Sequence, residues 1–271
     1  MERFKAYSEV FDQHRGNFAD KWESYLRVYD HELSPLRDSV RKMLEIGVQN
    51  GGSLEVFAGY FADAEQIVGL DICEDCRNIS FADPRISVEI ADASSGFANQ
   101  LLRQTYGQFD LILDDGSHRC DDITATFFSL VPLLAPGGTY IIEDMCCVYW
   151  REFGGGLKSP ASPMRLFKQL VDVINHEHWR SGFGIAAYLR ELGYDSLGED
   201  VIDRLRQIRS ISFYNSICVI RFNQNEADNL IGPRFCRGEH YALGFHATPG
   251  QTITEVGEPQ HDNPFNQSGP V

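Results

Sequence analysis

Short apolar runs alternate with longer amphipathic segments between about residues 43 and 143. This alternation is typical of βαβ units on a parallel sheet. Because Pro and Gly end helices, the sequence Ala135-Pro136-Gly137-Gly138 is expected to close one helix and turn the chain into a strand. The pattern predicts strands at 43–46, 66–70, 86–90, 109–113 and 139–142 and helices at 52–62, 74–81, 96–104 and 121–134. Together they predict an α/β, doubly wound sheet with helices on both faces.

The pattern changes after residue 144. Residues 145–162 combine aromatic side chains with three consecutive glycines, which predicts a mobile flap. Two further β runs are separated by Asn215-Ser216, a pair typical of a tight hairpin. This hairpin adds an antiparallel edge, so we expect a mostly parallel sheet of seven strands. The elements expected in this part are helices at 163–177 and 199–207 and strands at 210–214 and 217–222.

The length of 271 residues allows one sizeable core with small appendages. We expect an N-terminal helical segment at 1–40, a main domain at 41–222 and a C-terminal extension at 223–271. Beyond about residue 247 the chain is rich in Pro, Gly, Gln and Asn, which predicts a loose arm. The spacing of Trp22, Tyr25 and Tyr29 fits one packed face of an N-terminal helix.

Charge and composition exclude several classes of protein. A net charge of −15 without a basic stripe disfavours binding to nucleic acid. No apolar run approaches the roughly 20 residues that span a bilayer, and the N-terminus lacks the pattern of a secretory signal. Seven cysteines, an odd number, fit reduced thiols, and the pair Cys73 and Cys76 has no second pair to complete a zinc site. We therefore expect a cytoplasmic protein.

A glycine-rich turn, Glu45 to Ser53, follows the first predicted strand and opens a helix. Glycine lets the backbone approach a ligand closely, and free N–H groups at a helix start attract polar groups. Asp71 and Asp92 follow the next two strands, where they are placed to bind ribose hydroxyls and an adenine amine. A tight connection or a helix cap explains each feature alone, but their order along one sheet edge favours a cofactor.

Acidic residues also follow the fourth and fifth strands, in Asp114-Asp115-Gly116-Ser117-His118 and in Glu143-Asp144. Parallel strands bring these ends together, and clustered carboxylates repel unless a cation joins them. Carboxylate oxygens suit Mg²⁺, Mn²⁺ or Ca²⁺. We assign Asp114 to a helix cap or to cofactor contact rather than to the metal.

These motifs resemble those of class I S-adenosylmethionine (SAM) dependent methyltransferases, which have a Rossmann-like fold. The resemblance covers the turn after the first strand and the acidic residue after the second, which in that family bind the methionine part, ribose and adenine of SAM. The cofactor-binding residues that it implies here are Glu45, Gly47, Gln49, Gly51, Ser53, Asp71, Asp92, Ala93 and Asp114.

The acidic strand ends resemble cation-dependent O-methyltransferases of the catechol and caffeoyl-coenzyme A type. That resemblance makes Asp115, Glu143 and Asp144 the metal ligands and places His118 where those enzymes have a basic lysine. The sequence Asp-Gly-Ser-His is still more similar to macrolide-sugar O-methyltransferases of the mycinamicin type, as is Asp20-Lys21. Similarity to methyltransferases of bacterial surface-polysaccharide clusters extends from about residue 10 to 222.

The resemblance implies a divalent-metal-dependent enzyme that methylates a sugar hydroxyl of a glycan, a nucleotide sugar or a glycosylated natural product. Asp115 and His118 are the predicted catalytic residues, because a dication lowers the pKa of a hydroxyl and a histidine can take the proton. The acceptor is then a small molecule or a saccharide. Related sugar methyltransferases are often oligomers, so a homo-oligomer is an open expectation.

Aromatic and histidine side chains after the fifth strand are candidates for contact with the acceptor. Tyr149 and Trp150 are expected to stack on a sugar ring, whereas His176 and His178 fit either acceptor contact or a helix end. Two other functions compete with methyl transfer. A nicotinamide-dependent oxidoreductase is disfavoured by Gln49, which replaces the second glycine of the dinucleotide motif. A non-catalytic SAM-binding protein is disfavoured by the full set of acidic and histidine residues.

Overall fold

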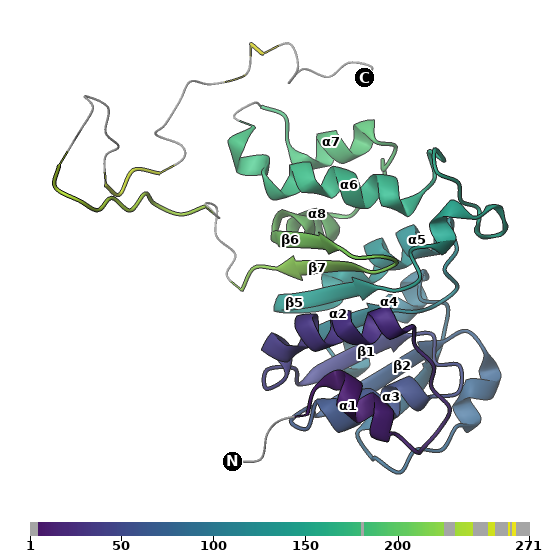
Figure 1. Cartoon of the computed structure of the whole chain (residues 1–271). Helices are drawn as coiled ribbons and strands as arrows, with labels where there is room; N and C mark the ends of the chain where they lie inside the picture. Colours follow the sequence, from purple (N-terminus) through teal and green to yellow (C-terminus); the bar gives the residue numbers. More distant parts are fainter. Residues whose placement is uncertain are drawn as a thin grey trace.

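Seven strands form one sheet in the order β3-β2-β1-β4-β5-β7-β6 (Figure 1). The computed structural model describes residues 5–179, 182–224, 231–240, 249–252, 260 and 262–263. The pairs among β1 to β5 are parallel, whereas β7 runs antiparallel to both β5 and β6. The strands are β1 Lys42–Ile46, β2 Gln66–Asp71, β3 Ile86–Ile90, β4 Phe109–Asp114, β5 Leu134–Ile142, β6 Ile208–Phe213 and β7 Cys218–Phe222. The predicted fold class is confirmed.

Helices cover both faces of this sheet (Figure 1). Apolar side chains alternate along the strands, so that Leu44 and Val68 pack on one face while Met43 and Ile67 pack on the other. The first face is covered by α4 to α8 and the second by α1 to α3. The helices are α1 Tyr7–Gln13, α2 Glu23–Leu33, α3 Gly52–Tyr60, α4 Gly96–Thr105, α5 Cys120–Leu130, α6 Pro163–Ile174, α7 Ile185–Glu191 and α8 Glu199–Arg206.

The N-terminal helix α2 lies against the second face of the sheet. Tyr25 and Tyr29 are buried there, as the spacing predicted. Trp22 differs, because the helix begins at Glu23 and leaves Trp22 as the residue before it, 66% exposed. Of the three aromatic residues predicted to form one packed face, only Tyr25 and Tyr29 therefore do so, and Trp22 is exposed to solvent.

Several predicted boundaries differ from the structure. Residues 74–81 form only a short 3-10 helix at Glu74–Asn78, and β5 begins at Leu134, so Ala135 to Gly138 belong to a strand with irregular register. The helix predicted at 163–177 ends at Ile174 and is followed by a 3-10 turn at His176–His178. Helix α7 was not predicted. The flap region contains two 3-10 turns, Cys147–Tyr149 and Arg151–Phe153.

The predicted loose arm beyond residue 247 lies mostly outside the described residues. Within the described part of the chain, no helix has both the length and the apolar character needed to cross a bilayer.

Candidate active site

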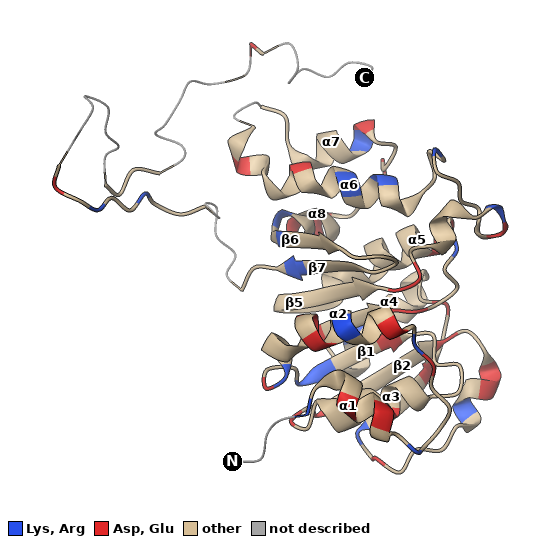
Figure 2. Cartoon of the chain, viewed as in Figure 1, with Lys and Arg blue, Asp and Glu red and all other residues tan. Residues whose placement is uncertain are grey.

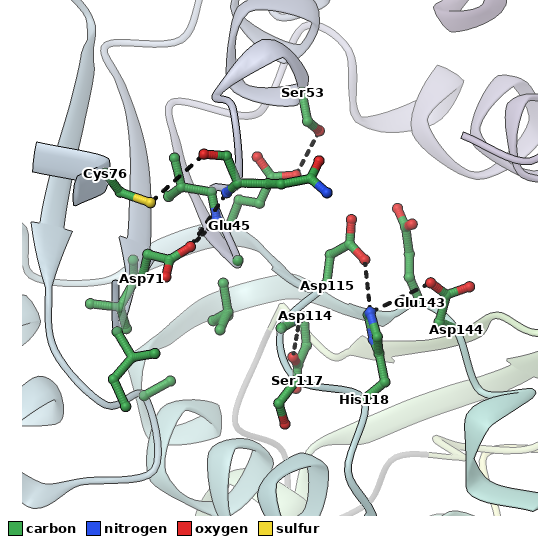
Figure 3. Close-up of a pocket in the computed structure, with 18 of the residues that line it drawn as sticks. Glu45, Ser53, Asp71, Cys76, Asp114, Asp115, Ser117, His118, Glu143 and Asp144 are labelled. Atoms are coloured by element: carbon green, nitrogen blue, oxygen red, sulfur yellow. Dashed lines mark hydrogen bonds and ion pairs between the residues drawn. The ribbon is translucent and has the colours of Figure 1, made fainter. Parts of the chain in front are cut away.

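A cavity of about 830 Å³ opens at the carboxyl ends of β1 to β5 (Figure 3). It lies beside the point between β1 and β4 where the strand order reverses, which is the usual ligand site of an open α/β sheet. Gly51 is the predicted cofactor residue that does not line it, because it packs against the Phe81 ring instead. The predicted residues that do line it are Glu45, Gly47, Gln49, Ser53, Asp71, Asp92, Ala93, Asp114, Asp115, His118, Glu143 and Asp144.

The turn after β1 requires glycine at position 47. Gly47 has a φ of +88°, and a Cβ there would lie 2.1 Å from the carbonyl oxygen of Asp115. Its N–H donates to the Leu70 carbonyl at 2.9 Å. The turn therefore packs directly on the end of β4, and the backbone forms the floor of the cavity.

Asp71 at the end of β2 holds this turn in place. Its carboxylate accepts hydrogen bonds from the backbone N–H groups of Val48 at 2.7 Å, Gln49 at 3.4 Å and Cys73 at 2.8 Å. Burial acts to raise the pKa of Asp71, but these donors outweigh burial and lower it. Asp71 thus stays ionised and connects two strand ends, while its predicted contact with ribose remains a prediction.

Asp92 is engaged within its own turn. Its carboxylate accepts from the Ser94 N–H at 2.9 Å and from the Ser94 hydroxyl at 2.7 Å. Ser95, rather than Asp92, caps α4 by accepting from the N–H of Ala98. The adenine contact predicted for Asp92 is therefore compatible with its place in the cavity but is not tested by these bonds.

Two buried carboxyl groups each present an oxygen without a partner. Glu45 accepts from the Ser53 hydroxyl at 2.6 Å through one oxygen, and Asp114 accepts from the Gly116 N–H at 3.3 Å through one oxygen. Their other oxygens make no hydrogen bond within the described chain. Burial raises the pKa of Glu45 to about 8 and that of Asp114 to about 7. Such orphaned acceptors fit a ligand that brings its own donors.

Among the residues that the structure describes, Asp115, His118 and Asp144 form a group that could hold a metal ion. One ligand atom from each lies within 4.8 Å of the others. The Nε2 atom of His118 is 3.9 Å from Asp115 Oδ1 and 3.5 Å from Asp144 Oδ2 (Figure 3). The strand ends predicted to converge do so, with the histidine between two carboxylates.

Glu143 is held by different partners. Lys21 donates to both Glu143 Oε2, at 2.8 Å, and Asp115 Oδ2, and Tyr29 donates to Glu143 Oε1. The side chains of Lys21 and Glu143 are only 4% and 2% exposed. Burial acts to lower the pKa of Lys21, but the carboxylates raise it overall, so this lysine stays charged. Burial raises the pKa of Glu143 to about 7 although Lys21 opposes the shift.

Lys21 and Tyr25 line the cavity and contact its acidic residues, but neither was assigned to the site from the sequence. The Tyr25 hydroxyl donates to Asp144 Oδ1 at 2.5 Å. Together, Lys21 and Tyr25 therefore contact three of the four acidic residues at the ends of β4 and β5. The only sequence signal for Lys21 was the pair Asp20-Lys21, which is part of the resemblance to macrolide-sugar O-methyltransferases. That pattern carried no indication of which atoms the lysine would reach.

The site also contains strained backbone. Among the described residues that are not glycine, four have a positive φ, and three of them, Gln49, His118 and Asp144, line the cavity. Left-handed conformations cost energy for these residues and collect at functional sites. His118 therefore lines the cavity from a left-handed backbone conformation.

The four residues predicted to contact the acceptor do not line this cavity. Tyr149 lines a second cavity instead, and Trp150 is half exposed. His176 bonds the Val173 carbonyl at 2.9 Å through Nδ1, as a residue at a helix end does, and His178 lies 3.8 Å from Glu177. Their contact with an acceptor stays a prediction. Two exposed aromatic residues, Phe18 and Trp22, line the cavity in their place.

Comparison with known proteins identifies the central part of the chain. Residues 44–145 match a family model described as a methyltransferase domain. The chain is 32% identical over 61% of its length to the 8-demethyl-8-alpha-L-rhamnosyl tetracenomycin-C 2'-O-methyltransferase of Streptomyces olivaceus. It is 35% identical over 55% of its length to the mycinamicin VI 2''-O-methyltransferase of Micromonospora griseorubida. These matches cover 46% and 39% of the two relatives, so the chain spans less than half of their length.

A solved structure shares the arrangement of the elements. This structure is the MycE methyltransferase of the mycinamycin biosynthetic pathway, in complex with Mg, SAH and mycinamycin VI. The match covers 82% of this chain and 54% of the MycE chain. The TM-score is 0.66 and the sequence identity 27%. The chain therefore shares the fold of this methyltransferase, and its residues 44–145 are similar to a methyltransferase domain.

Proposed function

We propose that this chain transfers a methyl group from SAM to a sugar hydroxyl and requires a divalent cation such as Mg²⁺. The observation that carries the proposal is the group of Asp115, His118 and Asp144, which lies in one cavity with the glycine turn after β1. The names of the similar proteins support it, since they describe methylation of sugars on natural products.

The cavity fits SAM by its donor and acceptor pattern. The turn at Gly47 offers close backbone approach, and the unpartnered oxygens of Glu45 and Asp114 can accept from an ammonium or amine group. When bound, SAM supplies a methyl group on a positively charged sulfur, which suits a cavity rich in carboxylates. The residues proposed to bind SAM are Glu45, Gly47, Gln49, Ser53, Asp71, Asp92, Ala93 and Asp114.

The metal ligands are proposed to be Asp115 and Asp144, with Glu143 as a third. Glu143 can join only if Lys21 moves, because its oxygens are now held by Lys21 and Tyr29. When bound, a divalent cation supplies Lewis acidity that makes a nearby hydroxyl easier to deprotonate. The acidic oxygens suit Mg²⁺, Mn²⁺ or Ca²⁺.

His118 is proposed to accept the proton of the acceptor hydroxyl. Its Nε2 atom lies within 4 Å of both Asp115 and Asp144, which orient the ring. Tyr25 fixes Asp144 by donating to it. Residues from segments 18–25, 114–118 and 143–144 line the cavity. We propose that they exclude water from a bound acceptor hydroxyl and align its oxygen with the methyl group.

We propose that residues 41–222 form the main domain and that residues 1–40 and 223–271 are appendages to it. The N-terminal appendage completes the site, because Lys21 and Tyr25 come from it. Phe18 and Trp22 offer exposed aromatic surface at the cavity on which a sugar or its apolar carrier can stack.

The test is methyl transfer from labelled SAM to a panel of sugars, sugar nucleotides and glycosylated natural products. EDTA should abolish transfer, and Mg²⁺ should restore it. His118→Asn should retain SAM binding and reduce turnover by about 100-fold or more, as loss of a general base does. Asn is preferred to Ala because His118 has a φ of 57°, which Asn tolerates.

His31→Asn serves as the control, because that residue is exposed in α2, lies outside the cavity and should keep its activity. Full turnover in EDTA or in the His118→Asn variant would refute the proposed mechanism. SAM binding without transfer to any acceptor, in the presence of metal, would favour a non-catalytic protein instead.

A further inference from the structure

A second cavity, of about 360 Å³, lies beside the N-terminal end of α6. It shares no lining residue with the larger cavity. Its wall is formed by the flap at Tyr149, by the loop before α6 and by the first turns of that helix. None of these residues has a role in the mechanism proposed above.

The charge around this cavity is opposite to that of the whole chain. Residues 153–171 contain three cationic side chains, Lys158, Arg165 and Lys168, and no carboxylate, although the net charge of the chain is −15. All three line the cavity (the two in α6 are blue in Figure 2), are exposed and form no ion pair with a described residue. The next carboxylate, Asp172, accepts a hydrogen bond from the Tyr188 hydroxyl at 2.8 Å.

Ser162 adds a polar group to the wall of this cavity. It lines the cavity at the residue before α6 and is only 6% exposed. Serine at this position normally accepts a hydrogen bond from the first turn of the helix. Ser162 makes no such bond, and its hydroxyl has no hydrogen-bond partner within the described chain. Its oxygen is not among the buried atoms that lack a partner, so the hydroxyl is accessible and can donate to a ligand in the cavity.

The wall of this cavity is connected to the candidate active site. Tyr149 follows Asp144 by five residues, and the same segment contacts the residues just after His118. Arg119 donates to the Glu152 carbonyl at 3.4 Å, and the Cys120 thiol lies 3.9 Å from the Val148 carbonyl. The segment that carries Tyr149 therefore contacts the residues that follow His118.

We propose that this cavity binds the phosphate group of a phosphorylated saccharide, which is the acceptor of the methyl group. This inference rests on the proposed function. Arg165 can form paired hydrogen bonds with phosphate oxygens, the lysines add charge, and the Ser162 hydroxyl adds a donor. The half-exposed ring of Tyr149 can stack on the attached sugar or base.

The experiment is calorimetric binding of glucose 1-phosphate, UDP-glucose and glucose to the full chain. EDTA is present so that phosphate cannot bind through a metal at Asp115, and saturating S-adenosylhomocysteine blocks the larger cavity to nucleotides. The cavity variant is Arg165→Gln with Lys168→Gln. The matched control is Arg190→Gln with Arg206→Gln, which removes the same charge from exposed positions in α7 and α8.

We expect wild type and control to bind at least one phosphate ester and not glucose, and the cavity variant to bind it about tenfold or more weakly, since charge-assisted hydrogen bonds are lost. Binding of both esters assigns the sugar phosphate itself as the ligand, and binding of UDP-glucose alone assigns the nucleotide-linked sugar. Ser162→Ala should weaken binding with no loss of S-adenosylhomocysteine affinity.

Equal affinity of the cavity variant and the control, or no binding of either ester to wild type, would overturn the inference. These measurements involve no methyl transfer. Their failure would therefore leave methylation of a neutral sugar untouched, whereas phosphate binding without any methyl transfer would count against the proposed function.

Discussion

Lys21 controls the charge balance of the candidate active site. It is a buried ammonium group between Glu143 and Asp115, and those partners also keep it charged. A buried ion pair adds little net stability compared with an apolar pair, but removing one partner leaves an uncompensated charge. Removing Lys21 should therefore lower the stability of the protein by more than the intact ion pair contributes to it.

Replacing Lys21 with Met should destabilise the protein by about 3 kcal/mol in the absence of divalent metal, because Glu143 and Asp115 then repel each other without a counter-charge. Urea unfolding at neutral pH measures this loss. The control Lys168→Met, at an exposed position, should change the free energy of unfolding by less than about 0.5 kcal/mol. Equal midpoints for the two variants would show that the buried ion pair is absent in solution.

Glu45 predicts a pH dependence of stability. Burial raises its pKa from 4.5 to about 8, so between these pH values the folded protein binds more protons than the unfolded chain. Its contribution to stability therefore falls as pH rises through this window. Gln has no charge to bury and can still accept from the Ser53 hydroxyl.

Glu45→Gln should thus gain stability relative to wild type as pH rises from 5 to 8. Urea unfolding of the apoprotein at both pH values measures the change. Ser53→Ala, which leaves the titrating group in place, should show no such gain. A constant difference between Glu45→Gln and wild type across the range would mean that Glu45 is ionised at pH 5 in the folded state.

At the scale of elements, the turn between β1 and α3 determines how the strand ends meet. Gly47→Ala would place a Cβ 2.1 Å from the carbonyl oxygen of Asp115 and would also strain a φ of +88°. Gly107 has a similar φ of +78° with nothing near its Cβ position, so Gly107→Ala isolates the cost of the backbone angle.

We expect Gly107→Ala to lose about 1 kcal/mol. Gly47→Ala should lose about 3 kcal/mol or more and bind SAM poorly, because the end of β4 must shift to make room. Thermal unfolding and calorimetry with S-adenosylhomocysteine measure the two effects. Similar losses of stability in both variants would contradict the close contact between this turn and β4.

The strands were predictable because a buried strand of a parallel sheet is a short, continuous apolar run. The first four match the structure to within one residue at each end. The fifth was predicted too short, because Pro136 and two glycines are typical of a turn. In the structure they continue the strand with irregular register, and Gly137 bonds the Asn223 carbonyl at 2.9 Å.

Helix α7 was not predicted because it has seven residues and buries only Ile185 and Leu189. So short a segment contains less than a full repeat of the apolar pattern. Its position depends on packing against the rest of the molecule rather than on its own sequence.

The acidic strand ends were predictable by the same rule that places ligands at the carboxyl edge of a parallel sheet. Asp115, His118 and Asp144 follow from it directly. Lys21 does not, because it lies 94 residues before Asp115 and 122 before Glu143 in the sequence. The ammonium group of Lys21 reaches these two carboxylates only because α2, which follows Lys21, packs on the sheet.

At the scale of the whole molecule, the site joins three segments that are distant in sequence. The N-terminal segment, the end of β4 and the end of β5 meet through carboxylates, one lysine and two tyrosines. A cation that binds only this assembled arrangement stabilises the folded state by mass action. Unfolding of the whole chain therefore reports whether a cation binds where these segments meet.

We expect Mg²⁺ at about 100 times its dissociation constant to stabilise the protein by about 2.7 kcal/mol, which raises the unfolding temperature by about 5–10 °C. Because the chain carries a net charge of −15, any salt also screens repulsion, so the comparison is made against NaCl at equal ionic strength. Asp115→Asn should lose the Mg²⁺-specific shift, whereas the exposed Asp63→Asn, which removes the same charge elsewhere, should retain it. If Asp115→Asn and Asp63→Asn respond alike, the stabilisation comes from general screening, and the three segments do not form a metal site.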